Sequence, residues 1–384
     1  MPRLIRFALR ALLVLVLIVA ALAIWKRDEI KRLMAVNSLF EAENIVHNFD
    51  HMNELFLTHP LSRGAGPISP LPEGPAAVLP KEAKQWIKDR NVTAMVVLKN
   101  GQLVHEGYYL GTRPEDLRIS WSVAKSFLSA LFGVLQAEGA FASLDDPVEK
   151  YAPLLKGSAY EGVTIRDVLT MSSGVAFNED YLDFNSDINK MGRVLALGGS
   201  MDEFAANLKL REAEPGSRWH YVSVDTHVLG MVIRGATGKD IPELLETRIL
   251  APMGFEEAPY YVTDGLGVSF VLGGLNVMTR DYARFGQMIA QGGLWQGKQV
   301  VPADWVKAST SPQAKDGTAY GFQWWIPPDA TPGEVMAQGI YGQYIYINPS
   351  LNVVIAVNAA DRGFEEAGVN EGNIAMLRKI AAGL

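Results

Sequence analysis

The stretch Ser122-Val123-Ala124-Lys125 runs directly into the apolar segment Phe127-Leu128-Ser129-Ala130-Leu131-Phe132. Residues three apart lie on one face of a helix, so a lysine at this spacing can reach the serine hydroxyl. A helix that begins at Ser122 also has unpaired backbone N–H groups there, which favour an anion. Desolvation beside other donors lowers the pKa of the lysine amine, which can then accept the serine proton. The stretch therefore predicts an activated serine at the start of an apolar helix.

A hairpin is predicted just before this helix. Two apolar segments, Val92–Leu98 and Leu103–His105, flank Asn100-Gly101. Asn-Gly is a preferred dipeptide for tight hairpin turns, because both positions accept a positive φ. Two antiparallel strands should therefore precede Ser122.

The order of the remaining segments predicts the fold class. From Ser122 to about Arg284 the pattern is mostly helical, with 163–171 and 228–236 as examples. Strands are expected again at 344–347 and 352–357, and a closing helix at 370–384. We predict an α+β fold, in which helices flank an antiparallel sheet built from both chain ends. A mostly helical region, about residues 126–285, is inserted into it.

The N-terminus carries a long apolar run, Phe7–Trp25, with Arg3, Arg6 and Arg10 before or just inside it. About 20 residues suffice for a helix to cross a bilayer. The basic start places that end in the cytoplasm and the body across the bacterial inner membrane, in the periplasm. A cleavable signal is the alternative, since Ala21-Leu22-Ala23 has the spacing of a cleavage site. A retained single-pass anchor is favoured, because the apolar run continues past that site.

Three regions follow from these patterns. Residues 1–28 are the anchor or uncleaved signal, and 29–80 form a connection that is first helical and then rich in proline and glycine. Residues 81–384 form the chemical domain, with the helical insertion inside it. Neither an internal repeat nor a low-complexity tract is seen.

Composition excludes several kinds of chemistry. The chain has 384 residues, is 48% hydrophobic and 20% charged, and contains no cysteine, so disulfides and thiol nucleophiles are ruled out. The net charge is −7, and residues 1–32 carry +5, which leaves −12 for the remainder. An acidic body argues against nucleic-acid binding.

Two other constellations are weaker. His47 and His51 have the spacing of a metal pair, but no third ligand follows closely, and a solvated helix face is the simpler interpretation. His220 and Asp225 could be offered as two members of a serine triad, yet no G-x-S-x-G elbow accompanies them. We therefore predict no metal and no cofactor.

Further motifs occur in a fixed order after Lys125. They are Tyr221-Val222-Ser223, Gly273-Gly274-Leu275, Thr279-Arg280-Asp281 and Ala283-Arg284-Phe285-Gly286. With Ser122-Val123-Ala124-Lys125 they resemble the serine β-lactamase and penicillin-recognising superfamily, in its C-type β-lactamase, D-alanyl peptidase and family VIII esterase branch. From about Asn44 onward the chain looks most similar to aminohexanoate-dimer hydrolases, which cut linear amides. Each motif alone is weak, but the ordered set is specific.

The resemblance implies roles for three residues. Ser122 attacks the carbonyl, Lys125 accepts its proton, and Tyr221 shuttles protons to the leaving group. A tyrosine can act as an acid in one half-reaction and as a base in the other. Ser223 is expected to hydrogen-bond the lysine or the substrate, with a helix N-cap before Asp225 as the alternative.

The third motif departs from the family pattern. Relatives carry Lys-Thr-Gly or His-x-Gly on an edge strand, whereas this chain has Ala337-Gln338-Gly339. The missing cation argues against β-lactams or cell-wall peptides as substrates, and aminohexanoate-dimer hydrolases also lack it. By resemblance, Gly339 permits close backbone approach, and the Ile340 N–H pairs with that of Ser122 in an oxyanion hole. Tyr341, which follows, is placed among the substrate-binding residues.

One more tyrosine falls on a loop. Tyr181, within 178–183, lies near a tyrosine that hydrogen-bonds the substrate amide in aminohexanoate-dimer hydrolases, so it is predicted to bind substrate from a mobile lid.

Taken together, the sequence predicts a membrane-anchored serine hydrolase that acts on esters or small linear amides through an acyl-enzyme. A β-lactamase or D-alanyl carboxypeptidase is the alternative enzyme. A ligand-binding sensor without turnover and a structural membrane protein with a decayed pocket are alternatives outside catalysis. The expected partners are a small-molecule substrate and, through the N-terminal helix, a membrane.

Overall fold

The computed structural model describes residues 3–384, and its centre is a five-stranded antiparallel sheet. The strands follow the order β3-β2-β11-β10-β9, with bounds β2 (Val92–Lys99), β3 (Gln102–Tyr108), β9 (Val335–Gly339), β10 (Gln343–Asn348) and β11 (Val353–Ala359). The predicted hairpin is confirmed, since β2 pairs with β3. Strand β2 also pairs with β11, so the two chain ends meet in the middle of the sheet.

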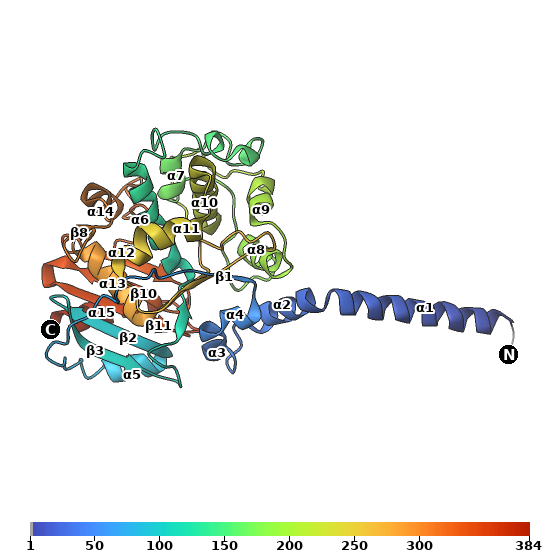
Figure 1. The fold of residues 1–384 in the computed structure, drawn as a ribbon, viewed down its shortest axis with the longest axis horizontal. Coiled ribbons are helices and arrows are strands. Elements are labelled where there is room, and N and C mark those ends of the chain that lie inside the picture. Colours follow the sequence, from blue (N-terminus) through green and yellow to red (C-terminus); the bar gives the residue numbers. More distant parts are fainter. Residues whose placement is uncertain (1–2) are drawn as a thin grey trace.

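Both faces of this sheet are covered, which explains why the central strands β2 and β11 are buried along almost their whole length. Val96 and Leu98 belong to one core with α13 (Thr279–Ala290), while Met95 and Val97 belong to a second core. This alternation is the two-residue period of a strand. The second core is closed by α5 (Ala83–Asp89) and α15 (Val369–Ala382), as Figure 1 shows.

A smaller sheet borders the first. Its order is β1-β5-β6-β4, with bounds β1 (Thr58–Pro60), β4 (Leu117–Ile119), β5 (Tyr260–Val262) and β6 (Leu275–Met278). Two short strands, β7 (Leu294–Trp295) and β8 (Lys298–Gln299), form a separate hairpin, followed by α14 (Ala303–Ser309).

The middle of the chain is helical, and it sits above the sheet in Figure 1. After α6 (Ala124–Ala137) come α7 (Ile165–Leu169), α8 (Asp187–Ala196), α9 (Met201–Asn207), α10 (Ser223–Thr237), α11 (Ile241–Leu245) and α12 (Ala251–Met253), with a π-helical turn at Glu246–Leu250 and single 3₁₀ turns at Val148–Lys150 and Pro153–Leu155. The predicted α+β class with a helical region between sheet-forming ends is therefore confirmed.

One helix is shorter than its pattern suggested. The segment 163–171 forms a helix only over Ile165–Leu169. Thr164 and Asp167 make a capping box, so the helix begins at Ile165, two residues later than predicted. Met171 has a φ of 55°, a left-handed conformation that does not continue a right-handed helix.

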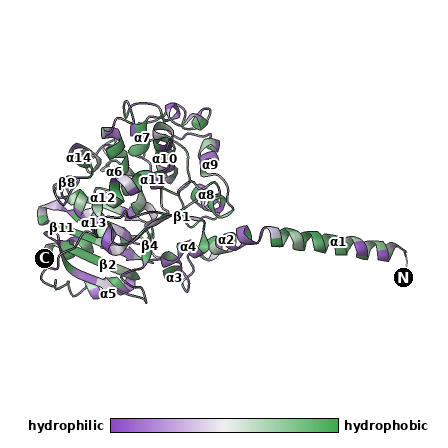
Figure 2. Ribbon diagram, in the orientation of Figure 1, coloured by the Kyte–Doolittle hydropathy of each residue, from purple (hydrophilic) through white to green (hydrophobic). Residues whose placement is uncertain are grey.

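The N-terminal region leaves the body and then returns to it. Helix α1 (Arg3–Trp25) projects away from the domain, and its ribbon is coloured mostly hydrophobic (Figures 1 and 2). None of the segment Ile5–Trp25 is buried. Helices α2 (Arg27–Ser38), α3 (Ile45–Asp50) and α4 (Met52–Leu55) follow. Leu39, Phe49 and Phe56 are buried in the main core, and β1 joins the smaller sheet. Much of the segment predicted as a connection thus packs into the domain.

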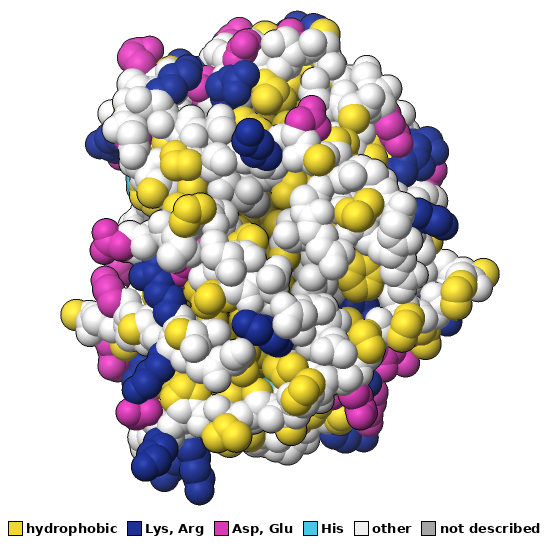
Figure 3. All heavy atoms as spheres, turned by 90° about the vertical axis from the view of Figure 1, so that its left-hand side faces the viewer, with side chains coloured by type: hydrophobic (Ala, Val, Ile, Leu, Met, Phe, Trp, Pro, Cys, Tyr) yellow, Lys and Arg dark blue, Asp and Glu magenta, His cyan; other side chains and the backbone are white. Residues whose placement is uncertain are grey.

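The face of the domain opposite α1 shows no field of a single sign. Basic and acidic side chains are interspersed over it with apolar ones, as Figure 3 shows. Such a mixed surface lacks the basic stripe typical of nucleic-acid binding.

Candidate active site

Ser122 is the middle residue of a 3₁₀ turn (Trp121–Val123), and helix α6 follows this turn directly. Lys125 is the second residue of α6, and its Nζ is 3.0 Å from the Ser122 Oγ. The predicted reach of the lysine to the serine is therefore present. Helix α6 begins two residues later than the sequence suggested, since the nucleophile itself lies in the 3₁₀ turn.

The Lys125 amine is held away from solvent, with only 2% of the residue exposed. Its Nζ lies 2.8 Å from the Leu272 carbonyl oxygen and 3.3 Å from the Ser223 Oγ. Burial lowers the pKa of Lys125 to about 7, while the nearby carboxylates of Glu179 and Asp225 oppose this shift. A large fraction of the amine is therefore neutral near pH 7 and able to accept a proton.

Tyr221 stands on the other side of the serine, just before α10. The hydroxyls of Ser122 and Ser223 lie near enough to that of Tyr221 to lower its pKa, and the Tyr221 ring stacks on Trp325 with centroids 5.3 Å apart. Burial, reinforced by the negative charge of Glu179, raises the pKa of Tyr221 well above its ordinary value. The phenol is therefore protonated at rest and placed to donate a proton.

Ser223 is the first residue of α10, and the structure separates its two predicted roles. The N-cap position is Val222, and no side chain caps this helix. The Ser223 hydroxyl instead contacts Lys125 and Glu179. Contact with the lysine is thus observed, and N-capping by Ser223 is wrong, because the helix begins one residue earlier than a cap at Ser223 requires.

Gly339 ends edge strand β9 against the nucleophile. A Cβ at this position would lie 2.7 Å from the Ser120 carbonyl oxygen and 3.1 Å from the Ser122 nitrogen. No larger residue fits without moving the backbone of the nucleophile turn. The next N–H, that of Ile340, has no acceptor among residues 3–384. An unpaired donor beside the serine is suited to bind a developing oxyanion.

The backbone on both sides of this site is strained. Trp121 and Tyr341 have φ values of 42° and 60°, in the left-handed region that non-glycine residues seldom adopt. Tyr341 is buried, and its ring stacks on that of Phe40 at 4.6 Å between centroids. Its side chain packs behind the site rather than lining it, so residues after α2 support the loop that carries Ile340.

Comparison with known proteins identifies the family. A model for beta-lactamase matches residues 82–377. The chain belongs to the beta-lactamase family. The sequence prediction of this superfamily is thereby confirmed.

Two relatives of this beta-lactamase-family protein are similar over most of its length. The 6-aminohexanoate-dimer hydrolase of Paenarthrobacter ureafaciens is 29% identical over 328 residues, which cover 80% of this chain and 83% of that enzyme. A solved structure of a candidate 6-aminohexanoate-dimer hydrolase from Bacillus anthracis superposes with a TM-score of 0.79 at 26% identity, over 89% of this chain and 95% of the other. A family VIII carboxylesterase shares the fold, with a TM-score of 0.61 at 15% identity over 79% of this chain and 95% of that one. This chain is therefore a serine hydrolase of the family, with relatives that differ in substrate.

Sequence reasoning missed one residue of this hydrolase site, Glu179. Its carboxylate accepts hydrogen bonds from the Tyr181 hydroxyl at 2.6 Å, from the Ser223 N–H at 3.0 Å and from the Ser223 hydroxyl. Glu179 therefore ties the predicted lid loop to the start of α10. In the sequence Glu179 is marked only as an acidic residue two positions before Tyr181. Its contact with Ser223 spans 44 residues of sequence and exists only in the folded chain.

Asp225 was considered only as a triad member, and the structure places it elsewhere. It accepts a hydrogen bond from the Tyr160 hydroxyl at 2.7 Å, and burial raises its pKa to about 8. His220 instead contacts Glu212. His220 and Asp225 therefore bond different partners, and Asp225 lies near enough to Lys125 for its ionised form to raise the pKa of that amine.

The two histidines considered as a metal pair stack on each other, with the rings of His47 and His51 4.0 Å apart. No group of three or more histidine, aspartate or glutamate side chains among residues 3–384 is arranged to hold a metal ion.

Proposed function

We propose that this protein hydrolyses esters or small linear amides through an acyl-enzyme at Ser122. The observation that carries this proposal is the buried Lys125 amine, 3.0 Å from the Ser122 Oγ. A serine hydroxyl needs an adjacent base to become a nucleophile, and a lysine with a pKa near 7 can serve as that base.

In this mechanism the neutral amine takes the serine proton while Oγ attacks the carbonyl carbon. The N–H groups of Ser122 and Ile340 stabilise the oxyanion. Tyr221 gives its proton to the leaving group and regains one from the ammonium of Lys125. Water then attacks the acyl-enzyme, with the same groups moving protons in the reverse order, and a carboxylic acid leaves.

We assign supporting roles to the other predicted residues. Ser223 holds the lysine, Gly339 leaves room for the oxyanion donors, and the Tyr181 hydroxyl, which lines the cavity at Ser122, contacts substrate. Tyr341 serves this site through its loop, and a direct contact between its side chain and substrate stays a prediction.

A fluorophosphonate probe and p-nitrophenyl acetate test the mechanism. Ser122→Ala should lose both labelling and turnover. Ser129→Ala is the matched control, since this serine lies on the same helix and its hydroxyl bonds the Phe322 carbonyl oxygen at 2.7 Å. Equal labelling of wild type and Ser122→Ala would exclude the mechanism.

Two further readouts separate the alternatives. A burst without steady turnover would indicate a ligand sensor, because acylation would then occur without hydrolysis. Nitrocefin turnover at rates comparable to esters would indicate a β-lactamase. The absence of a cation at Ala337-Gln338-Gly339 argues against that substrate class.

We further propose that α1 is a retained single-pass anchor in a bacterial inner membrane, with the hydrolase domain in the periplasm. The segment Ile5–Trp25 is 21 residues long and none of it is buried. Because basic side chains flank this segment at both ends, its orientation needs a direct test. A C-terminal alkaline phosphatase fusion should be active, and mass spectrometry of the native protein should find the N-terminus uncleaved.

A further inference from the structure

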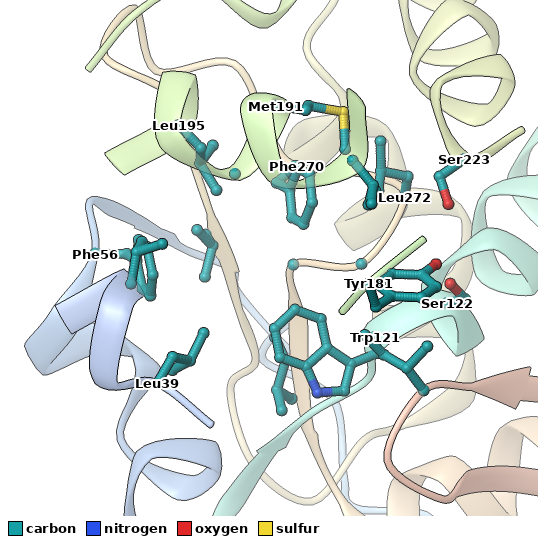
Figure 4. A pocket seen from close by; sticks show the side chains of 18 of the residues that line it. Leu39, Phe56, Trp121, Ser122, Tyr181, Met191, Leu195, Ser223, Phe270 and Leu272 are labelled. Carbon is teal, nitrogen blue, oxygen red and sulfur yellow. The ribbon is translucent and has the colours of Figure 1, made fainter. Parts of the chain in front are cut away.

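A long cavity opens at Ser122, and the two ends of its lining differ in chemistry. Figure 4 shows the hydroxyls of Ser122, Tyr181 and Ser223 gathered at one end, with Leu39 and Phe56 at the other. Between them lie apolar side chains from α8 and from the segment before β6, among them Met191, Leu195, Phe270 and Leu272.

The cavity has the size of a small-molecule site. The void measures about 820 Å³, a volume that includes its open mouth. A void of this size can hold the acyl chain of an ester.

Among residues 3–384, no charged side chain lines the cavity. Apart from the three hydroxyls named above, the polar side-chain groups of this lining are the amide of Asn189 and the indole N–H of Trp121. An ammonium or carboxylate inside the cavity would lose its hydration without gaining an opposite charge, which is costly. An uncharged apolar chain meets no such penalty.

The far end of the cavity lies next to the proposed membrane anchor. Val36 of α2, with Leu39 and Phe40 just after it, forms part of the lining, and α2 follows α1 after one intervening residue. The Arg32 guanidinium bonds the Ala196 carbonyl oxygen at 2.8 Å, which ties α2 to the end of α8. Ile30 and Met34, also on α2, expose their apolar side chains. The segment that enters the bilayer therefore continues into the wall of the cavity.

We propose that this cavity binds the medium- to long-chain acyl group of a lipid-like ester, whose carbonyl is then attacked by Ser122. This inference rests on the proposed function, and it narrows the substrate class from esters in general to esters of apolar chains. Each methylene that leaves water for the cavity should raise kcat/KM about fourfold until the cavity is filled.

The first experiment uses the full-length protein and p-nitrophenyl esters from acetate to dodecanoate. We expect kcat/KM to rise from acetate to octanoate. A matched pair tests the charge argument, because p-nitrophenyl hexanoate and 6-aminohexanoate differ only in a terminal ammonium. The hexanoate should be preferred about tenfold or more. Equal values for this pair, or a flat chain-length series, would overturn the inference.

Gly192 on α8 permits a clean test of the cavity itself. This glycine lines the cavity, and a Cβ built on it meets no atom within 4 Å. Gly192→Leu should therefore fold, helped by the higher helix propensity of leucine, while its side chain narrows the space. The gain in kcat/KM from acetate to octanoate should then disappear in this variant.

The matched control is Gly372→Leu, since Gly372 is a helical glycine on α15 whose Cβ position is equally open and which lies outside the cavity lining. It should keep the full chain-length gain. An unchanged gain in Gly192→Leu would contradict the assignment of the chain to this cavity. If the wild-type protein showed no Ser122-dependent turnover of any ester, acetate included, the proposed function itself would be refuted.

A vesicle arm distinguishes the source of the acyl chain. Full-length protein is reconstituted in phosphatidylcholine vesicles that contain a dodecanoate ester, and its rate is compared with that on the same ester in detergent micelles. A higher rate in vesicles would support capture from the bilayer. An equal rate would support a free ester that enters the same cavity.

Discussion

Helices α1 and α6 are the two most apolar long helices of the molecule, yet they have opposite surroundings. None of the span Ile5–Trp25 in α1 is buried, whereas 11 of the 14 residues of α6 are. The 21 residues in α1 match the thickness of a bilayer, and the 14 residues in α6 match the width of a domain. Two helices of similar composition therefore have different surroundings: protein encloses α6, whereas α1 is exposed and is proposed to lie in a membrane.

The basic side chains on these two helices also differ in their surroundings. Those of α1 lie in its first turns, at Arg3, Arg6 and Arg10, where a headgroup region can solvate them. Helix α6 carries Lys125 at its second position, fully enclosed by protein. Burial of an amine destabilises the fold. The same burial lowers the pKa of Lys125, and this lowered pKa lets the amine act as a base.

The most severe test of this contrast removes the buried charge. Lys125→Met should lower kcat/KM on p-nitrophenyl acetate about a thousandfold or more, because Ser122 loses its base. Thermal unfolding should show a Tm that is unchanged or higher, since an apolar side chain replaces a desolvated amine. Lys99→Met is the control, because Lys99 lies outside the site and its Nζ bonds the Leu351 carbonyl oxygen at 2.8 Å. If Lys125→Met kept a tenth of the wild-type kcat/KM, Lys125 would not be the base that activates Ser122.

The opposite manipulation places charge in α1. Leu13→Arg combined with Leu17→Arg should cost about 5 kcal/mol or more in membrane insertion. Fractionation and immunoblotting should then find the protein outside the membrane pellet, with its activity on p-nitrophenyl acetate per mole unchanged. Leu13→Ile with Leu17→Ile should stay in the pellet. Carbonate-resistant membrane association of the double arginine variant would show that α1 is not the anchor.

A third test addresses the backbone donors at the start of α6. Gly339→Ala places a methyl group against the Ser120 carbonyl and the Ser122 nitrogen, so the turn must shift. The expected loss in kcat is about a hundredfold, comparable to the removal of one oxyanion donor. Gly372→Ala, in open space on α15, should leave kcat unchanged. Equal kcat values for both variants would remove Gly339 from the site.

The smallest expected effect is a shift of the pH profile. Only the neutral amine of Lys125 accepts the serine proton, so kcat/KM should rise with pH through about 7 and fall about tenfold per unit well below it. Glu179 raises the pKa of this amine, so Glu179→Gln should move the acid limb to lower pH. Relative to its own plateau, the variant should retain about two- to fourfold more activity at pH 6. The exposed Glu203→Gln should not shift the limb, and a shift of Glu179→Gln to higher pH would contradict the electrostatics.

The predictable parts of this molecule are those set by neighbours along the chain. The hairpin at Asn100-Gly101 was found because turn residues and flanking apolar runs are local signals. The contact of Lys125 with Ser122 follows from helix periodicity over three residues. The helix at 163–171 was overextended, because its cap at Thr164 and the left-handed Met171 cut it at both ends.

What could not be predicted depends on segments that meet only after folding. The Leu272 carbonyl that holds Lys125 lies 147 residues away, and no pattern in the sequence marks it. Glu179 looked like one acid in a polar loop until the fold placed it on Ser223. The cavity wall formed by Leu39 and Phe56 comes from a segment that seemed to be a connection.

Spacing along the chain determined which groups form the reacting pair, and an apolar run of sufficient length determined where the chain can meet a membrane. The packing of distant segments decided how the pair behaves, because a lysine pKa falls only when protein replaces the water around it. The same packing decided the form of the substrate cavity, because its walls come from segments that lie far apart in the sequence, from Val36 to Ile340. Helix geometry is local, whereas desolvation is a property of the whole fold.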